Sequence, residues 1–307
     1  MWKWLFRAIG FVFAALIALF IVIIVRFQGW EAGIKSELLK NSTIAQTARG
    51  PIEYAEIGQG PAVLVVHGTP GGYDGDYASL KIVHAEQDGF RYVIPSRPGY
   101  LRTPLNVGVT PADQADAFAA LLDKLGIQKT AVIAHSGGGP SALQFALRYP
   151  DRCSALVLVA ALVRNYSGPP PQVPKSPAAL WTRDLLIYGF AGLARLKKAD
   201  PPDPQWPALV QAALRSVVPY KPRLAGVEND LVQETKLSGW PINKISCPTL
   251  ILQGTADQSV PLADAEYAHQ QISGSELVEV AGQDHMMELV KHKELDAKIL
   301  DFLRRHP

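Results

Sequence analysis

The sequence predicts an α/β protein whose mostly parallel central sheet is covered by helices on both faces. Short apolar runs suited to buried parallel strands alternate with helical patterns between about residues 50 and 305. One of these runs, 130–134, leads through a glycine-rich turn at Ser136 into a helical pattern. A proline-rich stretch, 162–241, interrupts the alternation. The 307 residues suffice for one large domain with an insertion, or for two small domains.

The elements can be placed in order along the chain. Strands are expected at 52–57, 62–66, 91–94, 130–134, 155–159, 249–253 and 277–280. Helices are expected at 77–87, 111–125, from the turn after Ser136 to 149, from near 261, and at 287–303. The helix at Pro111 has the clearest start signal, because Thr110 can cap it, proline suits its first position and Asp113 lies in its first turn.

The amino terminus predicts a transmembrane anchor. Residues 8–25 carry no charge, and in helical form they would span roughly 27 Å, close to the hydrocarbon core of a bilayer. Trp2, Trp4 and Trp30 lie near its ends, as interfacial anchors do. A cleaved signal peptide and a buried soluble helix are the alternatives, but no small-x-small cleavage site follows Val25.

The flanking charges bear on the orientation of this anchor. Lys3 and Arg7 precede it, which favours an inside amino terminus and an extracytoplasmic body on the periplasmic side of a single-pass membrane protein. Arg26, Lys35 and Lys40 follow it and weaken the asymmetry.

These patterns divide the chain into four parts. We expect an anchor at 1–28, a linker at 29–48, and a core formed by 49–161 together with 242–307. The insertion at 162–241 is too long for a plain loop and contains helical stretches such as 180–196. We therefore expect a mostly helical cap over the carboxyl edge of the sheet.

Composition excludes some partners. The net charge of +2 is too small to indicate a nucleic-acid-binding surface. The sequence does not determine the oligomeric state. Cys153 and Cys247 are far apart and no C-x-x-C or Cys/His cluster occurs, so neither a metal site nor a cofactor is expected. The two cysteines suit small core positions, with a disulfide as the alternative in an extracytoplasmic body.

Ser136 lies in the turn that predicts a nucleophile. A strand, a sharp turn and a helix form the context in which small-x-Ser-x-Gly exposes a serine hydroxyl at the sheet edge. The residues two before and two after the serine must be small, and here they are Ala134 and Gly138. A phosphate-binding loop is the alternative, but neither Gly-Lys-Ser/Thr nor Gly-x-Gly-x-x-Gly is present. A purely structural serine is the other alternative.

Two further polar residues follow predicted strands. Asp257 comes after 249–253 and His285 after 277–280, so both reach the ligand-binding edge of the sheet together with Ser136. A serine needs a base, which His285 supplies, and Asp257 can orient the imidazole and stabilise its protonated form. Asp284 is the alternative acid, and turn or surface roles are the alternatives for Asp257 and His285.

The loop at 67–72 is rich in glycine, which lets the backbone approach a ligand closely. The N–H groups of Thr69 and Gly137 are expected to form an oxyanion hole. His67 suits a bracing role in this loop better than a reactive one.

Four motifs in this order resemble the α/β-hydrolase-fold superfamily over about residues 50 to 305. They are His67-Gly68-Thr69-Pro70, Arg97-Pro98-Gly99-Tyr100, Ala134-His135-Ser136-Gly137-Gly138, and Gly254-Thr255-Ala256-Asp257 with His285. The family often has Asp before the second motif and Gly after it, where this chain has Ser96 and Leu101. A serine nucleophile argues against epoxide hydrolases and haloalkane dehalogenases.

The resemblance implies a serine hydrolase that cleaves carboxylic esters through an acyl-enzyme, with a small-molecule ester or apolar acyl substrate. An amidase, an aminopeptidase or a carbon–carbon bond hydrolase is the alternative. The loop Pro70-Gly71-Gly72 resembles that of proline iminopeptidases, which would need a cap carboxylate such as Glu228, Asp230 or Glu234. A ligand-binding homologue of low turnover is a further alternative.

The cap can serve in two ways. Its helical stretch at 180–196 carries apolar residues beside basic ones, as interfacial helices do, so it can face the membrane. The alternative is that these apolar side chains roof the active-site pocket.

Overall fold

An eight-stranded sheet forms the centre of the protein. The computed structural model describes residues 2–166, 168, 172–196 and 203–307. The strands lie in the order β1-β2-β4-β3-β5-β6-β7-β8. Their bounds are β1 Thr43–Thr47, β2 Gly50–Gly58, β3 Ala62–Val66, β4 Arg91–Pro95, β5 Thr130–His135, β6 Cys153–Val159, β7 Thr249–Gly254 and β8 Glu276–Val280. β2 pairs antiparallel with β1 and β4, and the remaining pairs are parallel, which confirms the mostly parallel sheet.

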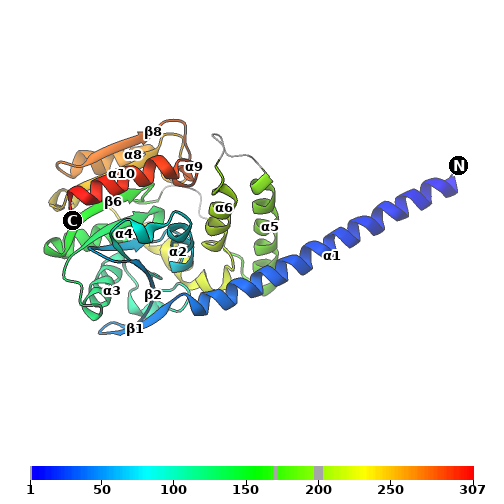
Figure 1. Cartoon of the computed structure of the whole chain (residues 1–307), viewed down its shortest axis with the longest axis horizontal. Helices are drawn as coiled ribbons and strands as arrows, with labels where there is room; N and C mark the ends of the chain where they lie inside the picture. Colours follow the sequence, from blue (N-terminus) through cyan, green and yellow to red (C-terminus); the bar gives the residue numbers. More distant parts are fainter. Residues whose placement is uncertain (1, 167, 169–171, 197–202) are drawn as a thin grey trace.

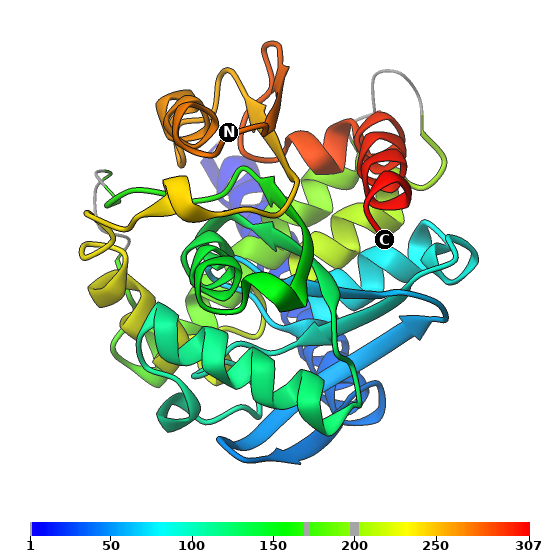
Figure 2. The same ribbon diagram turned by 90° about the vertical axis from the view of Figure 1, so that its left-hand side faces the viewer.

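Helices cover both faces of the sheet (Figure 2). One face packs against α3 (Pro111–Lys124), α4 (Gly139–Arg148) and α8 (Leu262–Gln271). The other packs against α2 (Tyr73–Ile82), α9 (Met287–Val290) and α10 (His292–Arg305). β3 and β6 are buried along their whole length because neighbouring residues point to opposite, equally covered faces. The sequence pattern predicted one helix at 287–303. The structure has two helices there, α9 and α10, with Lys291 between them.

The start of α3 follows the sequence signal. The Thr110 hydroxyl accepts a hydrogen bond from the Asp113 N–H at 3.1 Å, and the Asp113 carboxylate accepts one from the Thr110 N–H at 3.1 Å. Two otherwise free N–H groups are thus satisfied, so the helix begins at Pro111.

The described residues of the insertion after β6 include the α-helices α5 (Pro177–Leu196), α6 (Trp206–Arg215) and α7 (Leu224–Gln233). A buried ion pair ties it to the core: the Arg223 guanidinium lies 2.8 Å from the Asp74 carboxylate of α2. α5 and α6 lie beside the core, and α1 runs past them from β1 outward (Figure 1).

The amino-terminal helix α1 runs unbroken over Trp2–Lys40. The linker expected at 29–48 is therefore wrong in part, because residues 29–40 continue α1 and 43–47 form β1. The helix continues because its last turns are packed. Phe27 is fully buried with its ring 5.9 Å from that of Trp181 in α5, and the Trp30 indole donates to the Gln211 side chain of α6 at 3.2 Å.

The free part of α1 is long and apolar. Within the described chain, α1 alone has the length and composition to cross a bilayer, with a mean hydropathy of 3.2 over its most apolar eighteen residues. None of that window is buried against the body, which distinguishes it from a core helix. A signal sequence would have the same length and composition.

Cys153 and Cys247 are buried with free thiols, which suits the small core positions expected for them. The Cys247 thiol and burial together raise the pKa of the Cys153 thiol well above its usual range.

Candidate active site

Ser136 occupies the sharp turn between β5 and α4. Its φ of 47° lies in the left-handed region. This conformation is energetically unfavourable for any residue other than glycine, and it often occurs at functional turns. Space around the turn is small: a Cβ on Gly138 would lie 2.6 Å from the Val66 carbonyl oxygen of β3. This contact explains why a glycine follows the serine by two positions. Ala134, two positions before, is fully buried.

Three side chains form a hydrogen-bonded chain across the sheet edge. His285 Nε2 lies 3.0 Å from Ser136 Oγ, and His285 Nδ1 lies 2.8 Å from Asp257 Oδ2. A neutral imidazole with its proton on Nδ1 satisfies both contacts, since Nδ1–H donates to the carboxylate and Nε2 accepts from the serine hydroxyl. The structure thus brings together Ser136, Asp257 and His285 as the sequence predicts.

Asp257 is held as a carboxylate. Its side chain is buried, and Oδ1 accepts from the N–H groups of Ser259 at 2.8 Å and Val260 at 3.0 Å. Burial raises the pKa of Asp257, but the hydrogen bond from His285 and these N–H donors outweigh it, and the pKa lies below its usual value. The alternative acid Asp284 is exposed and accepts from the Met286 N–H at 2.9 Å, whereas the described partner of the imidazole Nδ1 is Asp257.

The loop after β3 lies directly against the serine. A Cβ on Gly68 would come within 3.0 Å of Ser136 Cβ, so only glycine allows this approach. No described residue accepts a hydrogen bond from the Thr69 N–H. A Cβ on Gly137 would lie 2.3 Å from Thr69 Oγ1, so the two residues proposed for an oxyanion hole are neighbours.

His67 braces this loop. Its Nδ1 contacts the Gly68 carbonyl at 2.8 Å and its Nε2 accepts from the Arg97 N–H at 2.9 Å. Burial, with the nearby Arg97 charge, lowers the pKa of His67 well below 6.5, so the ring is neutral and both nitrogens are occupied. This geometry agrees with the bracing role expected from the sequence.

The second motif differs from the common family pattern in ways that the structure explains. Ser96 donates to the Glu53 carboxylate at 3.0 Å, which ties the loop to β2. Leu101 adopts a φ of 51°, the conformation that glycine adopts without strain. The N–H of Leu101 donates to the Pro222 carbonyl at 2.8 Å, so a contact with the cap holds this conformation.

A buried polar network beneath the oxyanion loop was not predicted. Asp230 of α7 accepts from Arg97 at 2.6 Å, and from the hydroxyls of Tyr100 and Thr69 at 2.5 Å each. No local pattern indicates this network, because Arg97 and Asp230 are separated by 133 residues. Burial lowers the pKa of Arg97, but the opposing effect of Asp230 and other neighbours is larger. The pKa of Arg97 is therefore raised above its usual value, and the guanidinium is charged.

The cap carboxylates that could hold a substrate amine do not line the main cavity. Glu228 is exposed, and Asp230 is occupied by Arg97. Glu234 lines a separate small pocket with Asp230, outside the cavity described next. Burial and then the Asp230 charge raise the pKa of Glu234 to about 7.

A cavity of about 390 Å³ opens beside Ser136 and His285. Its cap side is formed by α6 and the residues that follow it, namely Leu209, Ala212, Ala213, Ser216 and Val217. No residue of α5 within 177–190 lines it, so the expected roof is built by α6 instead. Its volume is in the range of pockets for small organic ligands.

The fold and this serine site together define a class. The family model for the alpha/beta hydrolase fold matches residues 61–291, and the chain belongs to that family. It is a hydrolase of the α/β fold.

Similar proteins of known sequence or structure support this family assignment. An uncharacterized hydrolase, YcgS of Bacillus subtilis, is 30% identical over 273 residues, which cover 83% of this chain and 95% of the relative. The 2-hydroxy-6-oxo-6-phenylhexa-2,4-dienoate hydrolase of Comamonas testosteroni is 25% identical and covers 83% and 91%. An alpha/beta hydrolase fold protein from Nakamurella multipartita has a TM-score of 0.75 and 33% identity over 86% of this chain and 99% of its own.

Proposed function

We propose that the protein is a membrane-anchored serine hydrolase that cleaves carboxylic esters through an acyl-enzyme, with Ser136, His285 and Asp257 as its catalytic residues. The observation that carries this proposal is the unbroken hydrogen-bonded chain from Ser136 through His285 to the buried Asp257. Such a chain makes a serine hydroxyl nucleophilic at neutral pH.

The reaction follows from this geometry. Ser136 Oγ attacks the ester carbonyl carbon while His285 Nε2 takes its proton. The carbonyl oxygen becomes negative and accepts hydrogen bonds from the Thr69 and Gly137 N–H groups, each worth about 3 kcal/mol in the transition state. The protonated imidazole, stabilised by Asp257, then donates its proton to the leaving alcohol. Water repeats the sequence on the acyl-enzyme and releases the acid.

The cavity lining favours an ester over a dienoate. Several relatives are named as hydrolases of 2-hydroxy-6-oxo dienoates or dienedioates, which carry carboxylates. The described lining of the cavity includes the carboxylates of Asp76, Asp88, Glu288 and Asp296 and no Lys or Arg. His135, the protonated side chain in this lining, is paired with Glu288. An anionic substrate would meet like charge there.

A labelling experiment tests the nucleophile. The full-length protein in detergent should react with a fluorophosphonate probe, and Ser136→Ala should abolish the reaction. Ser141→Ala is the control, because the Ser141 hydroxyl bonds only the Gly138 carbonyl and should be dispensable. Labelling of Ser136→Ala at the wild-type rate would refute the assignment. An initial burst of p-nitrophenol from p-nitrophenyl esters would distinguish an enzyme from a low-turnover binder, and cleavage of a 2-hydroxy-6-oxo-dienoate instead would favour carbon–carbon hydrolysis.

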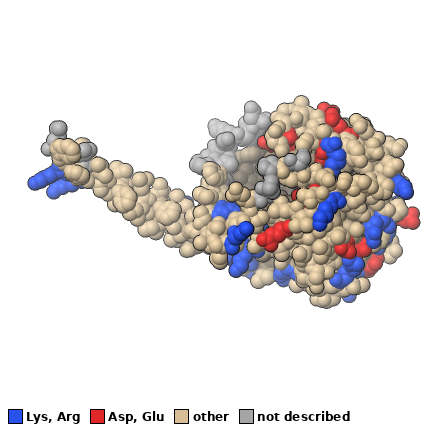
Figure 3. Space-filling view, turned by 180° about the vertical axis from the view of Figure 1, so that it is seen from behind, with Lys and Arg blue, Asp and Glu red and all other residues tan. Residues whose placement is uncertain are grey.

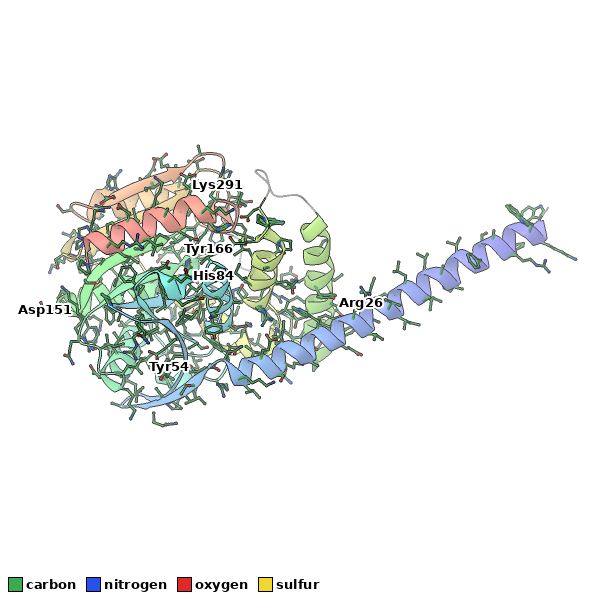
Figure 4. The ribbon with its side chains drawn as sticks, viewed as in Figure 1. Arg26, Tyr54, His84, Asp151, Tyr166 and Lys291 are labelled. Atoms are coloured by element: carbon green, nitrogen blue, oxygen red, sulfur yellow. The ribbon has the colours of Figure 1, made fainter. Side chains whose placement is uncertain are left out.

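The membrane part of the proposal is supported by α1. Arg26 lies where the helix leaves the body (Figure 4), and the rod beyond it is free of charged side chains until its tip (Figure 3). We propose that this rod crosses the bilayer and that the body lies on the extracytoplasmic side. The mass of the protein purified from membranes tests the anchor, because a cleaved signal would remove the first residues. Protease digestion of sealed vesicles tests the side.

A further inference from the structure

The cavity continues beyond the catalytic serine into a polar end. Its carboxylates come from α2, α9 and α10, and it also includes His135, the residue before Ser136. We call it the acidic end and define it by Asp76, His135, Glu288 and Asp296, all of which line the cavity. The walls between are apolar, and include Leu80, Val83, Ile133, Ile299 and Leu300.

The charges at the acidic end do not balance. His135 pairs with Glu288 at 3.0 Å, so one cation meets one of the three carboxylates. Burial lowers the pKa of His135, but the opposing effect of Glu288 is larger and brings the pKa to about 9, so the imidazole is protonated. Its Nε2 faces Glu288, and its Nδ1 is buried without a hydrogen-bond partner among the described residues. Asp76 has no salt bridge among the described residues, and Asp296 has one, to His292 at 3.7 Å.

Asp76 has an unused acceptor. Its Oδ2 atom is buried and has no hydrogen-bond partner among the described residues. Burial raises the pKa of Asp76 to about 6, so it is largely ionised at neutral pH. A buried acceptor without a donor is costly, and a ligand that donates to it would remove that cost.

Asp296 is also poorly matched. Among the described residues, its salt-bridge contact is with His292, whose Nδ1 is 3.7 Å away and whose Nε2 is already paired with Asp203. Burial, and then the charge of Glu288, raise the pKa of Asp296 to about 8. A cation placed here would lower that pKa and allow Asp296 to ionise.

These groups do not converge as a metal site. Among the described residues, no three His, Cys, Asp or Glu side chains are arranged to hold a metal ion. An ammonium group fits better, since it brings one positive charge and three donors to spread over separate acceptors.

We infer that the acidic end binds a primary ammonium group, so that the preferred substrate is an ester with an amine at the end of an apolar chain. The apolar walls hold the chain, Ser136 attacks at one end, and Asp76 receives the amine at the other. This inference rests on the proposed esterase function and names its substrate class.

A matched pair of esters tests it. p-Nitrophenyl 6-aminohexanoate and p-nitrophenyl heptanoate have chains of equal length and differ by one charge. The wild-type full-length enzyme in detergent should have the higher kcat/KM on the amino ester. Asp76→Asn should reduce the ratio of the two kcat/KM values about tenfold or more, because it removes a charged hydrogen bond. Asp151→Asn loses the same charge at the end of the body away from the cap (Figure 4) and should keep the wild-type ratio.

Each outcome decides between explanations. A wild-type preference for heptanoate, or an equal loss on both esters in Asp76→Asn, would overturn the ammonium site. Should neither ester be hydrolysed, the esterase proposal fails on its own, and protection against thermal unfolding by hexylamine but not by hexanol then tests the site. Equal protection by both compounds would refute it. If Asp76→Asn does not fold, Asp296→Asn removes the second acceptor and takes its place.

Discussion

Asp230→Asn removes the carboxylate charge that faces the Arg97 guanidinium at 2.6 Å. Both side chains are almost fully buried, with 4% and 2% of their surfaces exposed. Breaking a buried pair from one side leaves a charge without compensation and costs about 3–5 kcal/mol. One kcal/mol shifts the unfolding midpoint of a domain of this size by about 2–4 °C. A loss of roughly 6 °C or more is therefore expected.

Calorimetry of the full-length protein in detergent at pH 7 measures this shift. Glu276→Gln is the matched control, because its partner Arg305 and Glu276 itself are each 47% exposed. Exposed pairs contribute about 1 kcal/mol or less, so its midpoint should move little. Equal midpoints for the two variants would refute the reasoning that burial sets the cost. Asp230→Asn also removes the charge next to Thr69, so its ester turnover should fall as well.

Three further predictions concern other parts of the molecule. Asp257→Asn should lower kcat on a p-nitrophenyl ester by about 10⁴-fold, and Asp284→Asn by little; the reverse would identify Asp284 as the acid. Leu186→Asp with Phe190→Asp, both at exposed positions on α5, should reduce turnover of an ester dissolved in vesicles but not of a water-soluble ester, and equal effects on both would argue against a membrane-facing cap. The pKa of Asp296 is raised to about 8, so the folded state binds its proton more tightly and stability falls as pH rises from about 4 to 8. Asp296→Asn removes this pH-dependent loss of stability, so the difference in unfolding midpoint between the variant and wild type should shift in favour of the variant from pH 5 to pH 8. A difference that does not change with pH would contradict the raised pKa of Asp296.

The strands and the serine site could be predicted because their signals are local. The run before Ser136 becomes β5 and the apolar run 62–66 becomes β3 with the same bounds. The spacing of Asp257 and His285 after their strands was enough to place them beside the serine, because carboxyl ends of parallel strands share one edge.

The elements that the sequence did not predict depend on distant partners. β1 reads Thr-Ile-Ala-Gln-Thr, a mostly polar edge strand whose pairing with β2 is its main support. The continuation of α1 past Trp30 depends on burial of Phe27 and Ile34 against other parts of the chain. Asp76 and Asp296 are more than two hundred positions apart, so only the packed fold places them in one cavity.

One helix, α6, connects the proposed anchor with the proposed substrate site. Gln211 and Leu214 face α1, through the hydrogen bond from Trp30 and the apolar cluster around Phe27. Ala212 and Ala213 line the cavity. Packed helices lie about 8–10 Å apart, so the cavity begins roughly one helix diameter from α1. In an anchored enzyme this arrangement fixes the cavity close to the bilayer, because α1 continues without a hinge from the apolar rod to the residues that hold the cap. A substrate with an apolar chain would then have a short path from the lipid to Ser136.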